Sequence, residues 1–285
     1  MMSRVACFAW SLTLAAASAA GAAQTDSQVT LFLRRARAAT EKYRDQRVAI
    51  TEGYRAIGPE APAMGQHWLH PGLLVAARFD VEHPPILEYV TVQGQPLLAG
   101  VGYALPLGPG ELPPASPAGR AAWHSHAGGV EEESVRLSHD ETHAEHHAER
   151  VEVLHAWVRV DNPAGPFVPL NWALPFVRAG LEPNAAPHTE ASAKALSLDA
   201  EGAAFWETGL ARALVADSDA IRAMHRVLTA YADTVEAWRT HRPASPRLSG
   251  AEAAWLDRLW GRMHRALLGD LSGAARDRAS TLRGF

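Results

Sequence analysis

The chain has 285 residues, 47% of them hydrophobic and 20% charged, which is the balance of an ordinary globular protein. Its formal charge of −4 argues against nucleic-acid binding through a general basic surface. The single cysteine, Cys7, excludes a disulfide framework and a metal site built from cysteines. Histidine is the exception in this composition, because ten of the 14 histidines lie between His67 and His155.

The N-terminus has the pattern of a secretory signal peptide that covers residues 1–23. Arg4 supplies a positive charge, an uncharged and mostly apolar stretch runs from Val5 to Ala20, and small residues follow. The stretch is shorter than the roughly 20 residues that span a bilayer, which disfavours a membrane anchor. We therefore expect cleavage near Ala22 or Ala23, a periplasmic or secreted protein, and no integral membrane segment in the mature chain.

A long helix is expected from Gln28 to Ile57. Apolar residues recur at helical spacing across this segment, and charged residues between Lys42 and Arg47 provide a solvated side. Glycine followed by proline is a common helix stop, so Gly58-Pro59 predicts where the helix ends.

Short β-rich runs separated by proline and glycine follow between Pro62 and Pro175. This alternation of short β-rich runs with proline and glycine predicts an antiparallel sheet, arranged as a sandwich or a partial barrel. Two of the runs are joined by Gln93-Gly94, which favours a hairpin with a tight turn. The expected strands are Gln66–Leu69, Leu73–Phe79, Ile86–Val92, Leu97–Leu105, Trp123–His126 and Val151–Val160. With the preceding helix they form a predicted domain of residues 24–182.

The C-terminal third, residues 188–285, has the composition of a helical bundle. A linker is expected at Pro183–Pro187, then helical segments at Leu198–His241, broken near Ala216–Ser218, and at Ser249–Leu271. Ser249 begins a capping-box pattern. The predicted class is therefore α+β, with a long N-terminal helix, a central antiparallel sheet and a C-terminal helical bundle whose role the sequence leaves open.

The segment that contains His124 and His126 is the sharpest chemical feature of the sequence. Residues two apart on a strand point to the same face, so both imidazoles can reach one metal ion. Glu131 follows five residues after His126, and the three residues are similar to the ligand positions of the first cupin motif. The likeness is partial, because Gly119 is one residue too close and no glycine follows seven residues after Glu131. Exposed or structural histidines are the alternative interpretation.

Two further histidines, His155 and His67, are candidate ligands. His155 would lie on a largely apolar strand face, where an imidazole needs a hydrogen bond or an ion. A core histidine bonded by a backbone carbonyl is the alternative. His67 is favoured over His70 because the two face opposite ways on a strand and His70 abuts a proline. We expect ring nitrogens of His124, His126 and His155 within about 4–5 Å of each other, as bonds of about 2 Å to one ion require.

An acidic, histidine-rich segment, Glu131–Glu149, precedes the last predicted strand. Its imidazoles would share one face if the segment is helical. They are His139, His143, His146 and His147. Such a segment suits low-affinity capture of divalent cations, and a solvated surface helix or disordered loop is the alternative.

Six short motifs follow one another along the chain. They are Met64–His67, Ile86–Tyr89, Leu98–Tyr103, Trp123–His126, Leu154–Trp157 and Asn162–Phe167. In this order they resemble a family of uncharacterised exported bacterial proteins with MGxH, WHxH, LHxW and NPxGxF motifs. The resemblance covers about residues 35–176 and implies export. It also places the four candidate histidines within family motifs, without implying an activity.

The sequence as a whole favours an exported protein that binds a divalent metal, zinc or copper, through His124, His126 and His155 with His67 or Glu131. A metal-dependent enzyme, such as a cupin-like hydrolase, isomerase or oxygenase, is an alternative in which Glu131 serves as a base. A metal-free envelope protein that binds a partner through its helices is another. No sequence motif selects a substrate.

Overall fold

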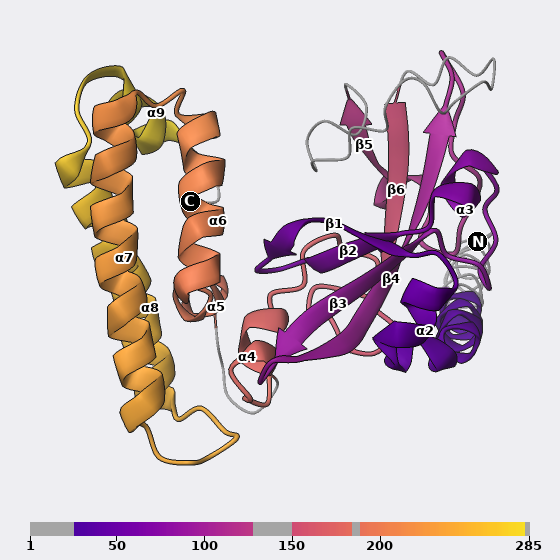
Figure 1. Cartoon of the computed structure of the whole chain (residues 1–285), viewed down its shortest axis with the longest axis horizontal. Coiled ribbons are helices and arrows are strands. Elements are labelled where there is room, and N and C mark those ends of the chain that lie inside the picture. The colour runs from indigo at the N-terminus through magenta and orange to yellow at the C-terminus, as the bar shows by residue number, and fades with distance from the viewer. Residues whose placement is uncertain (1–25, 128–149, 184–188, 283–285) are drawn as a thin grey trace, which may run out of the picture.

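The computed structural model describes residues 26–127, 150–183 and 189–282. Within these ranges an N-terminal helical segment, an antiparallel sheet and a set of C-terminal helices follow one another along the chain (Figure 1). This arrangement confirms the predicted α+β class. The expected signal peptide, the linker between Pro183 and Pro187, Glu131 and the histidine-rich run lie wholly or largely outside the described residues.

The sheet is a single open layer of antiparallel strands in the order β1-β2-β3-β4-β6-β5. Its strands are β1 (Arg55–Ala61), β2 (Gly65–Leu69), β3 (Ile86–Val92), β4 (Gln95–Leu107), β5 (His124–Ala127) and β6 (Arg150–Ala156). The sheet does not close on itself, and helices pack against its faces. In the described part of the chain it is therefore an open sheet, and the sandwich or partial barrel expected from the sequence is wrong.

The predicted hairpin between β3 and β4 is confirmed. Gln93 and Gly94 form its turn with φ of 50° and 74°, and Val92 pairs with Gln95 across it. A two-residue turn with both φ values positive matches the right-handed twist of the flanking strands. This turn sets the pairing as far as Tyr89 opposite Leu98, and a one-residue irregularity between Tyr89 and Glu88 then shifts the register so that Glu88 lies opposite Gly100.

The two faces of the sheet pack against different helices. On one face, Leu87, Tyr103 and Leu154 pack with Phe32 and Ala36 of the first helix (residues 26–39). Figure 1 shows this N-terminal helix and α2 (Gln46–Thr51) together at one side of the sheet. The opposite face is covered in part by α3 (Pro71–Val75) and α4 (Leu174–Arg178). That second face carries the polar group described below.

The single long helix expected between Gln28 and Ile57 is wrong. The chain instead forms the first helix, a 3₁₀ turn η1 (Glu41–Arg44), α2, and then β1, which includes Gly58 and Pro59. The first helix ends at Thr40, whose amide and hydroxyl both donate to the Ala36 carbonyl, at 3.1 Å and 2.7 Å. Asp45 then starts α2 as its N-cap by accepting from the backbone of Arg47.

The strand expected at Leu73–Phe79 is also wrong, because this segment begins with the short helix α3. His70 is its N-cap, and the Nδ1 atom of His70 accepts from the Leu73 amide at 3.2 Å. Pro71 occupies the first helical position, where its missing amide proton costs nothing.

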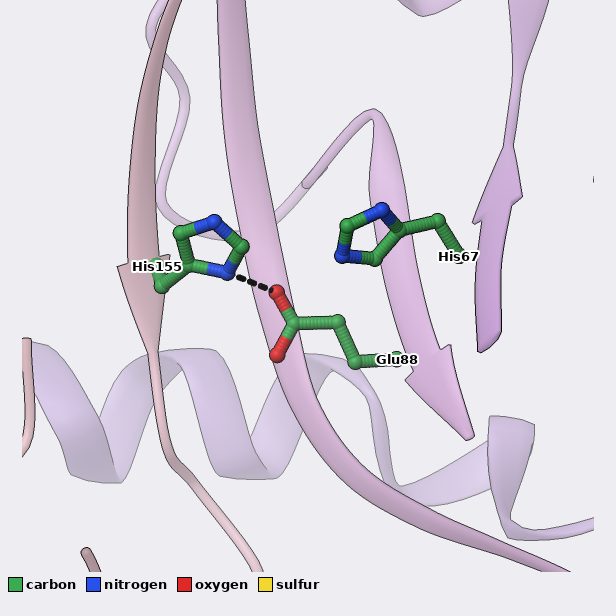
Figure 2. A group of neighbouring side chains, drawn as sticks. All are labelled: His67, Glu88 and His155. Atoms are coloured by element: carbon green, nitrogen blue, oxygen red, sulfur yellow. Dashed lines mark hydrogen bonds and ion pairs between the residues drawn. The ribbon is translucent and has the colours of Figure 1, made fainter. Parts of the chain in front are cut away.

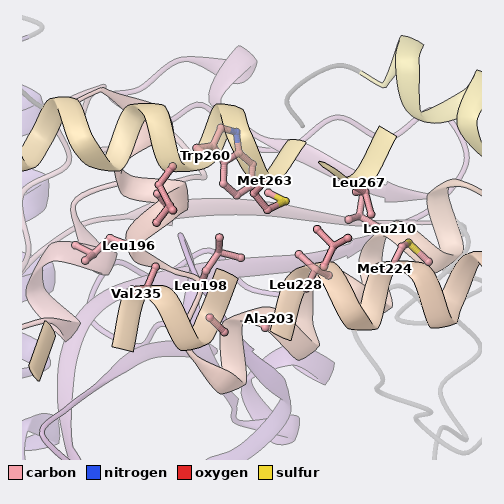
Figure 3. Close-up of a cluster of buried hydrophobic side chains, with 14 of the residues drawn as sticks. Leu196, Leu198, Ala203, Leu210, Met224, Leu228, Val235, Trp260, Met263 and Leu267 are labelled. Atoms are coloured by element: carbon pink, nitrogen blue, oxygen red, sulfur yellow. The ribbon is translucent and has the colours of Figure 1, made fainter. Parts of the chain in front are cut away.

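The C-terminal helices share one hydrophobic core, in which Leu198, Met224, Leu228, Met263 and Leu267 are buried (Figure 3). The helices are α5 (Glu190–Leu196), α6 (Ala200–Ala213), α7 (Ser218–His241), α8 (Gly250–Asp270) and α9 (Gly273–Thr281). The predicted break near 216–218 and the capping box at Ser249 are both confirmed. None of the helices within the described ranges is long and apolar enough to cross a membrane.

An ion-pair network joins the helical part to the sheet. The guanidinium of Arg178, nine-tenths buried, lies 3.4 Å from Glu60 on β1 and 3.1 Å from Asp199 at the start of α6. Arg239 on α7 reaches the same Asp199 carboxylate at 3.4 Å. Removing one member of a buried network leaves a charge without its partner, so this network favours one arrangement of bundle and sheet.

Candidate metal centre

Three buried polar side chains lie together on the second face of the sheet. His67 comes from β2, Glu88 from β3 and His155 from β6, and their exposed fractions are 6%, 0% and 1%. Each offers one ligand atom, and these three atoms lie within 4.8 Å of one another, so the group could hold a metal ion. Figure 2 shows the Glu88 carboxylate between the two rings. We call these three residues the His–Glu–His group.

Two glycines allow Glu88 to reach across β4, the strand that separates it from β6. Gly100 lies opposite Glu88 and Gly102 lies opposite His155, so β4 presents no side chain beneath the group. A Cβ at position 100 would overlap the Oε2 atom of Glu88 and lie 2.9 Å from the ring of Trp157. Glycine inside a strand often marks a close approach of this kind, and here the approach is made by the carboxylate.

His155 and Glu88 form a short hydrogen bond. The Nδ1 atom of His155 lies 2.5 Å from Oε1 of Glu88, and both side chains are inaccessible to solvent. The second carboxylate oxygen, Oε2, is buried and has no hydrogen-bond partner among the residues that the structure describes. A buried carboxylate with one unsatisfied oxygen is costly, so this position favours an additional positive charge.

His67 completes the group from the other side of Glu88. It lies directly opposite Glu88 in the β2–β3 register, and its ring centre is 5.6 Å from that of His155. His70 is instead engaged as the N-cap of α3. Of these two histidines, His67, which the sequence favours, is therefore the one that belongs to the His–Glu–His group.

His124 lies beside the group but outside it. It pairs with Val153, so it shares the sheet face of His155 on the neighbouring edge strand. The His124 and His155 rings are stacked, with centres 5.1 Å apart and planes inclined by 13°. His126 pairs with Val151 farther along β5, and its side chain lies outside the described part of the structure, as does Glu131.

The expected set of ligands and the observed group therefore overlap only in part. The structure joins His155 to His67, and the predicted convergence of His124, His126 and His155 remains a prediction because one of these side chains is not described. Glu88 was missed, since it looks like an ordinary polar residue of a strand. The signal for it was the pair Gly100 and Gly102, which leaves space on one face of the next strand.

A loop after β6 fixes the ring next to His155. The Trp157 ring lies nearly parallel to the His155 ring, with centres 6.2 Å apart, and its Nε1 donates to the Val168 carbonyl at 2.7 Å. Asn162 donates to the same carbonyl at 3.1 Å and accepts from the Ala164 amide at 3.0 Å. The turn that begins at Asn162 thus holds Trp157 in place.

Comparisons with protein-family models, with curated proteins and with solved structures found no match to this chain. The functional assignment therefore depends on the chemistry of the His–Glu–His group and on the sequence of the chain itself.

Proposed function

We propose that this chain is an exported protein, periplasmic or secreted, that binds one divalent cation through the His–Glu–His group. The observation that supports this most strongly is that three donor atoms, from three separate strands, are buried within 4.8 Å of one another. Imidazole and carboxylate together suit zinc and copper, and we propose one of these as the metal. The proposed export is supported by the N-terminal sequence.

The charge of the group favours a cation. As metal ligands, two imidazoles bind in their neutral form and the carboxylate ionised, so the ligand set contributes a net charge of −1. Glu88 has no lysine or arginine partner among the described residues. A divalent ion that takes a lone pair from each residue would also supply the missing partner for the buried carboxylate. An ion bound at the Nδ1 atom of His155 would take the place of the hydrogen-bond proton, which the neutral ring would then carry on Nε2.

A metal-dependent enzyme is the second candidate, and one observation favours it. The group offers two histidines and one carboxylate, a set that catalytic zinc sites use while a water or substrate occupies the remaining position. In such a site the ion would lower the pKa of the bound water. No described residue selects a substrate.

Elemental analysis of tag-free protein tests the proposal. We expect about one zinc or copper ion per chain, as the three-donor site requires, and a loss of this metal in both Glu88→Gln and His67→Gln. His225→Gln is the matched control, because His225 is an exposed histidine on α7 paired with Glu207. Thermal unfolding followed by circular dichroism verifies that each variant is folded.

Two outcomes would contradict the proposal. If folded Glu88→Gln and His67→Gln both retain stoichiometric metal, the metal site lies elsewhere. The run of histidines at 139–147 is then the next candidate. A wild-type protein that neither contains nor binds zinc or copper would favour the metal-free envelope protein, in which the Glu88–His155 hydrogen bond is only structural.

A further inference from the structure

We infer that His124 is a fourth ligand, which closes the coordination sphere of an ion held by the His–Glu–His group. This inference rests on the proposed metal site, and it decides between the two candidate functions. A site closed by four protein ligands is typical of structural and carrier zinc, whereas catalytic zinc keeps an open position.

The position of His124 fits this role. It is diagonal to His155 across the β5–β6 pair, an arrangement in which long side chains on one face of a sheet can meet. Two imidazoles that bind one tetrahedral ion have ring centres about 5 Å apart, since each nitrogen lies about 2 Å from the ion. The observed separation of the His124 and His155 ring centres is 5.1 Å.

For His124 to bind the same ion as His155, only the orientation of the His124 ring has to change. The His124 and His155 planes are inclined by 13°, so their nitrogens are not aimed at a common point. Rotation about the Cβ–Cγ bond of His124 turns the ring without moving the backbone, and this terminal torsion has a broad energy profile. The strand pairing with Val153 can therefore remain as it is.

The burial of the four side chains indicates the side from which His124 approaches. The three members of the His–Glu–His group are buried, whereas His124 is partly exposed on the edge strand β5 and its Nδ1 atom is itself buried. His124 thus lies at the solvent side of the group, where a three-ligand ion would otherwise carry water. Its imidazole would replace that water.

Cobalt(II) tests the inference, because its visible spectrum reports the number of ligands. Four-coordinate cobalt absorbs far more strongly in the visible range than five- or six-coordinate cobalt. We expect wild-type protein to bind one Co²⁺ with an intense, tetrahedral spectrum. In His124→Ala, the space left by the ring should admit two or more waters, which raise the coordination number to five or six, so the absorption should fall severalfold. The affinity should decrease at least about tenfold, no less than when an outer-shell partner of a ligand is lost.

His225→Ala, at the exposed histidine of α7 that pairs with Glu207, is the control and should keep the wild-type spectrum. His126→Ala, two residues from His124 on the same strand, is measured beside it. An unchanged spectrum and affinity in His124→Ala would overturn the inference while leaving the proposed site intact. A change confined to His126→Ala would assign the fourth position to that residue instead. If wild-type protein binds no Co²⁺, Zn²⁺ or Cu²⁺, the proposed function fails and the inference fails with it.

Discussion

The Glu88 carboxylate on β3 meets the His155 ring on β6 across an intervening strand, at a distance of 2.5 Å. Residues on strands that are not neighbours in a sheet seldom touch, because side chains of the middle strand separate them. Here the middle strand presents glycine to both partners. The two glycines of β4 therefore allow the carboxylate to contact the imidazole, and this contact lies on the second face of the sheet.

Gly100→Ala should disrupt the His–Glu–His group. The added methyl group would collide with the Glu88 carboxylate and the Trp157 ring, and overpacking of this kind costs about 1–3 kcal/mol of unfolding free energy. We expect lower stability in urea unfolding and weaker zinc binding by isothermal titration calorimetry. Gly209→Ala is the control, since Gly209 lies within α6 with open space around it and should gain about 0.5–1 kcal/mol. Unchanged zinc affinity in Gly100→Ala would show that Glu88 need not occupy its observed position.

Apolar replacement of the buried pair should separate folding from metal binding. In metal-free protein, His155→Leu leaves the Glu88 charge buried without a partner, which costs about 3–5 kcal/mol. Replacing both residues by leucine removes the charge as well, so the double variant should recover most of this loss. We expect it to be folded by circular dichroism yet unable to bind zinc. A double variant that binds zinc as tightly as wild type would exclude these residues as ligands.

Asn162→Ala should loosen the ring that lies beside His155. The variant removes hydrogen bonds to the Val168 and Leu170 carbonyls and from the Ala164 amide, leaving polar backbone groups that cost about 1–3 kcal/mol if they stay buried. Asp161→Ala, at the exposed neighbouring position, should have little effect. Urea unfolding measures both. Equal stability of the two variants would mean that this loop does not depend on the Asn162 side chain.

Asp80 should make the protein sensitive to acid. The Glu82 amide, followed by the His83 and Arg78 side chains, lowers the pKa of Asp80 from 3.8 to about 2. The ionised form is thus favoured in the folded state, and its contribution to stability is present above about pH 4 and lost as the pH falls toward 2. The difference in unfolding free energy between wild type and Asp80→Asn should shrink over this range, as measured by urea unfolding at several pH values. A difference independent of pH would contradict this explanation.

The sequence predicts the fold class well because its signals are local. The Gln93-Gly94 turn, the strand at Ile86–Val92 and the capping box at Ser249 each depend on a few neighbouring residues, and each is confirmed. The long N-terminal helix was wrong because its break depends on contacts that periodicity does not report. One of them is the hydrogen bond from Tyr89 to the backbone carbonyl of Tyr43, 46 positions away.

The candidate site was harder to predict because it depends on strand order. Nothing near Glu88 in the sequence indicates that His155 lies within hydrogen-bond distance, 67 residues farther along the chain. The histidines can be recognised as candidate ligands because imidazole is unusual on an apolar strand face. A single glutamate in a predicted strand does not indicate whether it is buried or exposed. Only the pairing of β3 with β4, and of β4 with β6, brings the carboxylate to the imidazole.

Anomalous diffraction at the zinc absorption edge, from crystals of tag-free protein grown with equimolar zinc, tests the central claim most directly. We predict one strong peak within bonding distance, about 2.0–2.2 Å, of a nitrogen of His67, an oxygen of Glu88 and a nitrogen of His155. A fully loaded crystal whose peak lies elsewhere, with the Glu88–His155 hydrogen bond still in place, would contradict it.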